Sequence, residues 1–208
     1  KYAFDKGIRE IDTAPVYGIK IHDVEKKIGK VIKKEKLKYK INTKFSVNKL
    51  LINNKNDLKK SLNSQLENSL KSLKKETIDN YFFHSGTDEE FIIDDIWDFL
   101  YQKKKEGYIK NLCLSLKHDL VKKNSLNQLD YLEKYRINKI STVCNLFSKE
   151  SVRKVIPLCR KKNIFVYGRM PLAKGLLSGK YKNYSIFNRS DPRSKDLNLT
   201  KNIINFSK

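Results

Sequence analysis

Long apolar runs are missing from this sequence. A helix that spans a membrane needs about 18 consecutive apolar residues, and no stretch of the 208 residues approaches that length without charges. Residues 1–6 also contain no apolar segment of the kind found in signal peptides. We therefore expect no membrane partner and no secretion signal, and we predict a cytoplasmic protein.

Cysteine is scarce. Cys113, Cys144 and Cys159 are an odd number of thiols, and their spacing fits neither a disulfide framework nor a metal site. Each lies in or beside an apolar run, which is typical of small buried side chains. We expect three reduced, buried thiols and no bound metal, in agreement with a cytoplasmic location.

Acidic residues are few relative to basic ones. Lys and Arg total 45 against 23 Asp and Glu, a formal net charge of +22. Such a charge raises the possibility of a nucleic-acid partner. The excess is mostly Lys dispersed along the chain, whereas nucleic-acid surfaces combine clustered Arg with aromatic residues. We favour a solvated basic surface with no specific nucleic-acid site, although it would favour an anionic cofactor and bind polyanions in a salt-sensitive way.

The remaining composition, with 39% hydrophobic residues, indicates one globular domain over residues 1–208. Short apolar runs predict strands at 7–13, 38–43, 77–84, 111–115, 139–145 and 164–169. Amphipathic stretches between them predict helices at 22–34, 56–73, 91–106, 120–134 and 149–162. In the first helix we place Val24, Ile28 and Val31 on the apolar face, and in the second Leu58, Leu62, Leu66, Leu70 and Leu73. Residues 182–208 lose this alternation and predict a loop or a loosely ordered tail.

Alternating strands and helices predict right-handed βαβ units and a parallel sheet. A closed (β/α)8 barrel needs eight strands and about 250 residues, whereas a doubly wound sheet can use six strands. The periodicity leaves both architectures open.

Four titratable side chains lie at or just after the ends of three successive predicted strands: Asp12, Tyr17, Lys44 and His84. In parallel α/β folds the active site lies at this end of the strands. Each residue alone is more often structural, as a loop cap, a packed aromatic ring, a surface charge or a hydrogen-bonded histidine. Their joint occurrence favours a catalytic set.

These residue types suit carbonyl reduction. A tyrosine phenol, with a pKa near 10, is a weak acid at neutral pH, and a neighbouring ammonium lowers that pKa. Tyr17 would then donate the proton, with Lys44 beside it and Asp12 holding Lys44 in place. His84 would hydrogen-bond the carbonyl oxygen and orient the substrate.

Three motifs carry a family resemblance: Ile-Asp-Thr-Ala-Pro-x-Tyr-Gly at 11–18, Thr-Lys at 43–44 and Ile-Asp-x-Tyr-x-x-His at 78–84. In this order they closely resemble the aldo-keto reductases. The resemblance implies a (β/α)8 barrel and NADPH as cofactor, with NADH as a possible substitute. It also implies a small-molecule carbonyl substrate and a catalytic tetrad of Asp12, Tyr17, Lys44 and His84.

The second half of the chain resembles the family's cofactor segments. By resemblance, Ser115 would bond the nicotinamide carboxamide, Arg169 would replace the tyrosine that often stacks on that ring, and Ser141 stands where many relatives have Gln. Residues 169–181 are similar to the loop that covers the pyrophosphate. The implied cofactor set is Asp12, Ser115, Arg169, Pro171, Leu172, Ala173, Lys174, Lys180 and Arg193.

The resemblance covers strands two to seven of the family's barrel. The first and last strand units have no counterpart, so we expect an incomplete barrel and favour a partial sequence. Completion by a partner and a degraded relative are the alternatives. The predicted function is NAD(P)H-dependent reduction of an aldehyde or ketone. A non-catalytic cofactor-binding subunit and an inactive fragment remain alternatives, and the sequence assigns no oligomeric state.

Overall fold

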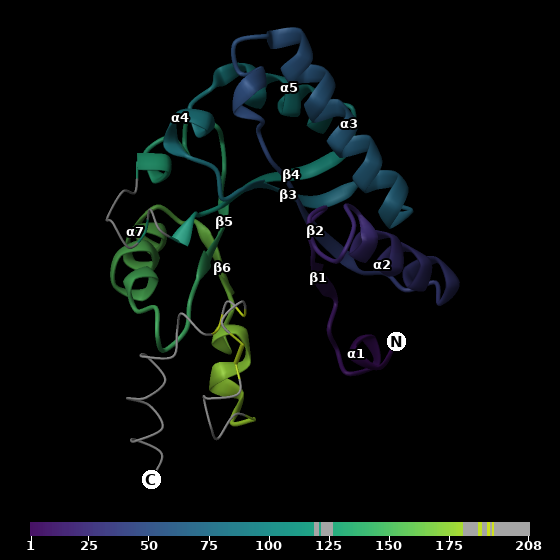
Figure 1. The fold of residues 1–208 in the computed structure, drawn as a ribbon. Coiled ribbons are helices and arrows are strands. Elements are labelled where there is room, and N and C mark those ends of the chain that lie inside the picture. Colours follow the sequence, from purple (N-terminus) through teal and green to yellow (C-terminus); the bar gives the residue numbers. More distant parts are fainter. Residues whose placement is uncertain (119–120, 122–126, 181–186, 189–190, 192, 194–208) are drawn as a thin grey trace.

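Six parallel strands form one curved sheet in the computed structural model, which describes residues 1–118, 121, 127–180, 187–188, 191 and 193. Their spatial order follows the sequence, with β1 and β6 at the two edges. A doubly wound sheet reverses its strand order, so this order confirms the barrel-type architecture and removes the alternative. Figure 1 shows the open, arched sheet. The strands are β1 (Glu10–Asp12), β2 (Lys40–Phe45), β3 (Ile78–His84), β4 (Ile109–Ser115), β5 (Lys139–Val143) and β6 (Phe165–Arg169).

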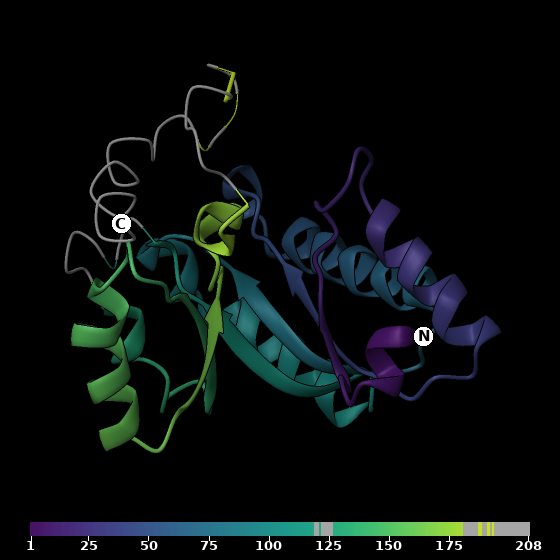
Figure 2. The same cartoon turned by 90° about the horizontal axis from the view of Figure 1, so that it is seen from below.

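Helices cover the convex face of this sheet and leave its concave face open, as Figures 1 and 2 show. The longer ones are α2 (Asp23–Lys34), α3 (Lys55–Leu73), α5 (Asp94–Lys105) and α7 (Ile156–Lys161). The shorter helices of the described residues are α1 (Tyr2–Asp5), η1 (Lys49–Leu51), α4 (Asp88–Phe91), η2 (Asn127–Leu129), η3 (Ser151–Val155) and η4 (Ala173–Ser178). Within the described ranges, no helix combines the length and apolarity needed to cross a membrane.

The main core lies between the helices and the convex face. Phe45, Phe83 and Trp97 are almost fully buried there, and their rings contact one another edge-on or tilted at 5.7 to 6.2 Å. The predicted leucine face of α3 is confirmed, since Leu58, Leu62, Leu66 and Leu73 are buried and Leu70 packs against the core. Apolar burial of this kind supplies most of the stability of such a layer.

The predicted apolar face of α2 is correct for Ile28, which packs against the core, and for the partly buried Val24, but it is wrong for Val31. Val31 is 47% exposed, and the buried side of the helix instead carries Glu25, Gly29 and Ile32. Gly29 explains this difference, because a Cβ on it would lie 2.3 Å from the backbone oxygen of Ser72 in α3. The close approach of the two helices therefore turns a carboxylate inward.

Two predicted helices also differ from the structure. The described end of the predicted helix 120–134 is a 310 turn at η2 followed by further turns, and residues 119–120 and 122–126 lie outside the described part. The predicted helix 149–162 contains the π-helical turn η3 before α7. Pro157 lacks a backbone N–H, so it interrupts the regular ladder at this junction. The predicted tail 182–208 lies outside the described residues except for 187–188, 191 and 193.

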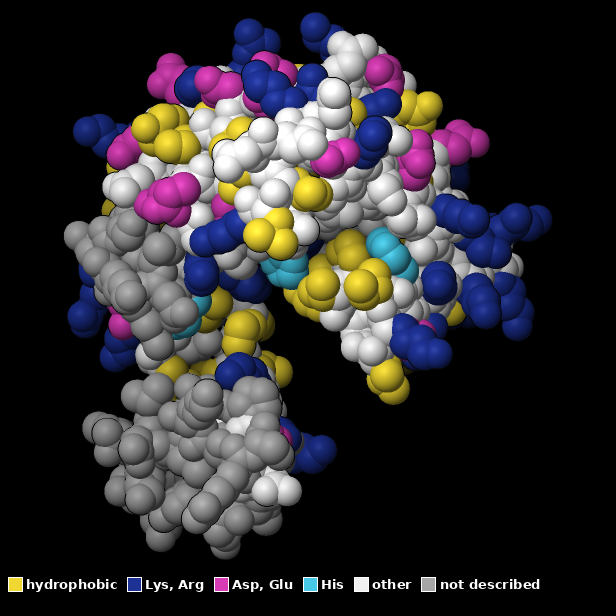
Figure 3. All heavy atoms as spheres, turned by 45° about the horizontal axis from the view of Figure 1, so that its top comes forward, with side chains coloured by type: hydrophobic (Ala, Val, Ile, Leu, Met, Phe, Trp, Pro, Cys, Tyr) yellow, Lys and Arg dark blue, Asp and Glu magenta, His cyan; other side chains and the backbone are white. Residues whose placement is uncertain are grey.

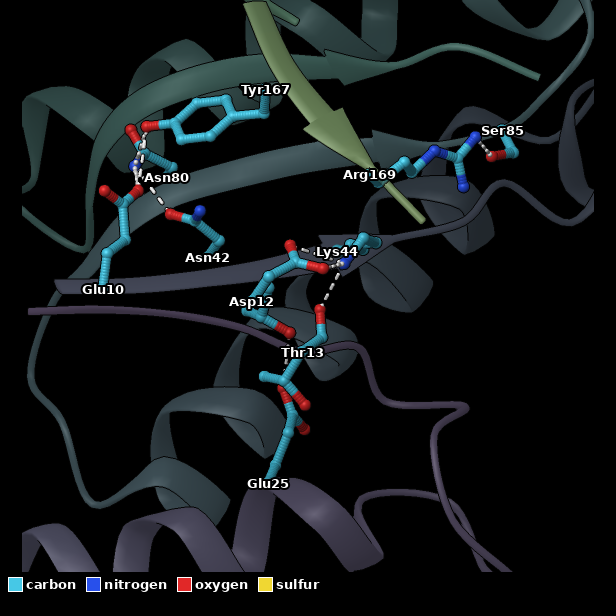
Figure 4. A network of polar contacts seen from close by, with 11 residues as sticks. Glu10, Asp12, Thr13, Glu25, Asn42, Lys44, Asn80, Ser85, Tyr167 and Arg169 are labelled. Atoms are coloured by element: carbon cyan, nitrogen blue, oxygen red, sulfur yellow. Dashed lines mark hydrogen bonds and ion pairs between the residues drawn. The ribbon is translucent and has the colours of Figure 1, made fainter. Parts of the chain in front are cut away.

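The concave face carries polar side chains. The Tyr167 hydroxyl on β6 donates to Glu10 Oε1 on β1 at 2.8 Å, and the Asn80 amide on β3 donates to Asn42 Oδ1 at 2.7 Å and to Glu10 at 3.2 Å. Figure 4 shows this network spanning the inside of the arch. It links the two edge strands directly.

Candidate active site

Asp12 and Lys44 form the centre of the site at the carboxyl end of the sheet. The Lys44 ammonium donates to Asp12 Oδ1 at 2.9 Å, to Oδ2 at 3.0 Å and to the backbone oxygen of Thr13 at 2.6 Å. Lys44 is almost fully buried, whereas the Asp12 side chain is 50% exposed. Lys44 lies inside β2, not after it as predicted, because the strand continues to Phe45. Figure 4 shows the pair facing the interior.

Tyr17 lies beside this pair on the loop after β1. The Lys44 ammonium is 5.0 Å from the centroid of the Tyr17 ring, and the ring of His84 approaches Tyr17 edge-on at 6.3 Å. The hydrogen bonds of this ammonium among the described residues go to Asp12 and Thr13. Lys44 therefore acts on Tyr17 through its charge. Tyr17 is 36% exposed, so its ring is accessible from the mouth of the site.

His84 ends β3 and faces the same mouth. Burial, followed by the positive charges of Lys44 and Arg169, lowers the pKa of His84 to about 4. The imidazole is therefore neutral at pH 7 and suited to a hydrogen bond with a carbonyl oxygen. The structure brings all four predicted tetrad residues together, from three adjacent strands and one loop.

Arg169 adds a second cation to the site. Its guanidinium donates to the backbone oxygen of Leu116 and, at 3.4 Å, to Ser85 Oγ. Burial lowers the pKa of Arg169, while Tyr17 and Asp12 act in the opposite direction, so these groups lie within electrostatic reach of each other. Sequence reasoning had placed Arg169 against a cofactor and had missed its influence on His84.

Three buried polar groups on β4 to β6 have no hydrogen-bond partner within the described part of the chain: the hydroxyls of Ser115 and Ser141 and Nε of Arg169. Ser115 and Ser141 are direct neighbours in the β4–β5 register. Unpaired buried polar groups are costly, which makes such a cluster a candidate ligand contact. Two adjacent hydroxyls fit the oxygen and nitrogen of a carboxamide, so this region suits the amide of a nicotinamide.

Of these three residues, Arg169 lines a cavity of about 320 Å3. Figure 3 shows the molecule hollowed on this side, with histidine and hydrophobic side chains at the edge. Of the predicted cofactor residues, Arg169, Ala173 and Lys174 line the cavity. Pro171 and Leu172 lie in the exposed turn that precedes Ala173. The remaining lining includes Ser85, His118, Asn145 and Ser148, which the prediction did not assign.

The predicted phosphate contacts are less well defined. Lys180 is exposed at the end of the segment that follows β6. Arg193 is paired with Asp191, with its Nε 2.9 Å from Asp191 Oδ1, and it lies over the Phe187 ring at 4.3 Å. The described residues therefore give Arg193 a local role and do not bring it to the cavity.

The cysteines lie outside this constellation. All three are free thiols. Cys113 and Cys159 are buried as predicted, whereas Cys144, which was also predicted to be buried, is half-buried. Burial raises the pKa of the Cys113 thiol to about 12 and that of Cys159 to about 11. Over the ranges that the structure covers, no group of three or more His, Cys, Asp or Glu residues is arranged to hold a metal ion.

Comparison with known proteins agrees with this geometry. The model of the aldo/keto reductase family matches residues 1–205. The chain is 29% identical to probable aldo-keto reductase 1 of Glycine max over 97% of its own length and 58% of the relative's. Glycerol dehydrogenase AKR11B4 from Gluconobacter oxydans superposes with a TM-score of 0.77 at 29% identity, covering 93% of this chain and 58% of that one.

A third protein shares the fold at lower identity. An aldo-keto reductase from Klebsiella pneumoniae, solved in complex with NADPH, gives a TM-score of 0.64 at 19% identity over 92% of this chain and 63% of that one. The chain thus spans a little under two thirds of the length of these relatives. The extent of the family match, together with the shared fold, shows that the chain belongs to the aldo/keto reductase family.

Proposed function

We propose that the protein reduces an aldehyde or ketone to an alcohol with NADPH, or NADH, as the hydride source. The observation that carries this proposal is the convergence of Asp12, Tyr17, Lys44 and His84 at one end of the sheet. A phenol and a neutral imidazole face one mouth there, beside a buried ammonium. These groups match the needs of a carbonyl oxygen that takes up a proton.

Each of the four residues has a separate role in the proposed reaction. His84, neutral at pH 7, holds the carbonyl oxygen by a hydrogen bond. Tyr17 donates its hydroxyl proton to that oxygen, and the ammonium of Lys44 stabilises the resulting phenolate through its charge. Asp12 fixes the ammonium at 2.9 Å and keeps it from turning toward solvent.

The β4–β6 side suits the cofactor, whose nicotinamide supplies the hydride when bound. Ser115 and Ser141 would hold the carboxamide, Arg169 would lie by the ring, and Ala173 and Lys174 would line the path toward the phosphates. The Klebsiella relative was solved with NADPH, which supports this choice. The net charge of +22 favours a phosphorylated ligand as well.

The test is the Tyr17→Phe variant, with Tyr2→Phe as a matched control because Tyr2 is an exposed ring on α1. Turnover of an aldehyde panel with NADPH should fall by about 10²- to 10⁴-fold in Tyr17→Phe, the usual contribution of a general acid. The affinity for NADPH should stay unchanged in both variants. Equal turnover in Tyr17→Phe and the native chain would contradict the proposed proton donor.

A non-catalytic cofactor-binding subunit is the second candidate, favoured by the single observation that the Lys44 ammonium bonds Asp12 and Thr13 and faces the Tyr17 ring at 5.0 Å from its centroid. It predicts NADPH binding without turnover. For location we propose the cytoplasm, supported by the three free thiols. We further propose that the partner is a small carbonyl compound and that nucleic acids bind only nonspecifically.

A further inference from the structure

Glu25 is a buried carboxylate that the proposed reaction does not use. It lies in the first turn of α2 and is fully buried. A buried charge is costly unless several hydrogen bonds satisfy it. Glu25 meets this condition through contacts with three different segments of the chain.

The first contact reaches the strand that carries Lys44. The Thr43 hydroxyl donates to Glu25 Oε1 at 2.6 Å, and Thr43 immediately precedes Lys44 on β2. Successive side chains on a strand point to opposite faces, so Glu25 holds β2 from the helix side while Lys44 faces the site. The second contact is with α3, where Ser69 Oγ donates to Glu25 Oε2 at 3.4 Å.

The third contact reaches the loop that carries Tyr17, which we call the Tyr17 loop (residues 14–22). Nδ1 of His22 lies 2.5 Å from Glu25 Oε2, and because an ionised carboxylate only accepts, the ring nitrogen donates. His22 is the last residue of the loop and has a left-handed backbone, with φ at 64°. Its N–H also donates to the Pro15 oxygen at 2.7 Å, which closes the loop on itself.

Asp23, next to His22, also holds the Tyr17 loop, because its carboxylate accepts from the Ile19 N–H and its own N–H donates to Lys20 O at 3.0 Å. Tyr17 N donates to Ala14 O at 3.1 Å, and Gly18 next to it has a φ of 102°, a conformation that suits glycine. Ile19 and Ile21 are 95% and 68% exposed. The position of the Tyr17 ring therefore depends on the anchors that α2 supplies, through Asp23 and through the contact of Glu25 with His22.

We propose that Glu25 is a positioning residue for Tyr17, joining His22 at the end of the Tyr17 loop to Thr43 beside Lys44. This role rests on the proposed function, because it matters for catalysis only if Tyr17 is the proton donor. Releasing either link lets the phenol drift from the ammonium while the β4–β6 side stays intact. A misplacement of about 1 Å at a reacting group can cost up to about 10²-fold in rate.

Two variants test the two links. Glu25→Gln keeps the shape but offers one acceptor oxygen to three donors. His22→Asn removes only the loop contact, and asparagine tolerates a left-handed backbone. Its matched control is Lys36→Asn, an exposed residue after α2 with φ at 52°. The control for Glu25→Gln is Glu35→Gln at the other end of the same helix.

Hydrogen exchange of the Tyr17 and His22 amides gives a readout that needs no turnover. We expect these amides to exchange at least tenfold faster in both test variants, with the amides of α5 unchanged. We also expect kcat to fall by about tenfold or more in Glu25→Gln and less in His22→Asn, at constant affinity for NADPH. If Glu25→Gln fails to fold, His22→Asn carries the test.

Unchanged exchange at Tyr17 and His22 would overturn the proposal, as would faster exchange with native kcat in a chain that reduces carbonyls. A parallel loss of NADPH affinity would indicate general disruption and would also overturn it. If the native chain has no turnover with any carbonyl, the proposed function fails. Faster exchange in the test variants would then still support the hold of Glu25 on the loop, and unchanged exchange would reject it.

Discussion

The two halves of the sheet differ in what holds the polar side chains of the candidate site. On β1 to β3, Lys44 is held by Asp12 and Thr13, and Glu25 accepts from three neighbours, although the hydroxyls of Thr13 and Tyr81 have no partner among the described residues. On β4 to β6, the hydroxyls of Ser115 and Ser141 have no partner among the described residues. The chain itself holds Lys44 and Glu25 in the first half, whereas the two adjacent serine hydroxyls of the second half are groups that a ligand would satisfy. In the proposed function, this contrast corresponds to a division between proton donation and cofactor binding.

Removing one member of the central ion pair should have the largest effect. Asp12→Asn leaves the buried Lys44 without its counter-charge, so the free energy of unfolding should fall by about 3 kcal/mol or more. Lys44→Met should cost less stability, because the remaining Asp12 is half exposed, although turnover should still be lost. Urea unfolding followed by the buried Trp97 measures both. Equal destabilisation by Asp12→Asn and Lys44→Met would contradict the claim that the buried Lys44 depends on Asp12 more than Asp12 depends on Lys44.

The unpaired serines should respond in the opposite way. Ser115→Ala and Ser141→Ala remove buried hydroxyls that lack partners, so each should leave the unliganded chain as stable as before or about 1 kcal/mol more stable. Each should weaken NADPH binding by about tenfold, the loss of one hydrogen bond. Calorimetric titration measures the NADPH dissociation constant, and urea unfolding measures the free energy of unfolding. A stability loss with unchanged NADPH affinity would remove the contrast between the halves.

His84 should make stability depend on pH on the acid side. Its pKa in the folded chain, about 4, lies below the unfolded value near 6.5, so the unfolded chain binds more protons between these pH values. The stabilising contribution is complete above pH 6.5 and is lost as the pH falls toward 4. In His84→Gln the slope of stability against pH in this window should decrease. Arg169→Gln should move the His84 titration, followed by NMR, toward higher pH.

The smallest effect concerns the surface charge. Binding to a polynucleotide should be weak and should fall steeply with salt, because dispersed lysines neutralise phosphates without reading bases. Figure 3 shows Lys and Arg side chains distributed around the visible face. A filter-binding titration from low to physiological salt measures the slope. Tight binding that survives physiological salt would place a nucleic-acid site on the molecule.

The sequence predicted those features that depend on periodicity and on motifs at strand ends. The apolar runs predicted all six strands of the sheet. The motifs predicted that Asp12, Tyr17, Lys44 and His84 lie close together, because parallel strands bring their carboxyl ends to one edge. Strand order decided the barrel type, and periodicity does not encode strand order. The end of β2 was misplaced because a lysine is expected in a loop unless it is known to be buried against a counter-charge, here Asp12.

Other features could not be predicted because they depend on contacts distant in sequence. The inward turn of Glu25 follows from the approach of α3 to Gly29, which the apolar pattern of α2 conceals. The influence of Arg169 on His84 joins β6 to β3 across the open interior. Ser85 and His118 line the cavity but were not predicted, because each is a single polar residue next to a motif.

The most direct test of the division between the halves is a parallel measurement on Tyr17→Phe and Ser115→Ala. The NADPH dissociation constant and the single-turnover rate at saturating NADPH are determined for each variant and for the native chain. The account predicts that Tyr17→Phe loses rate and keeps its affinity, whereas Ser115→Ala loses affinity and keeps its rate. It is contradicted if both variants change the same parameter.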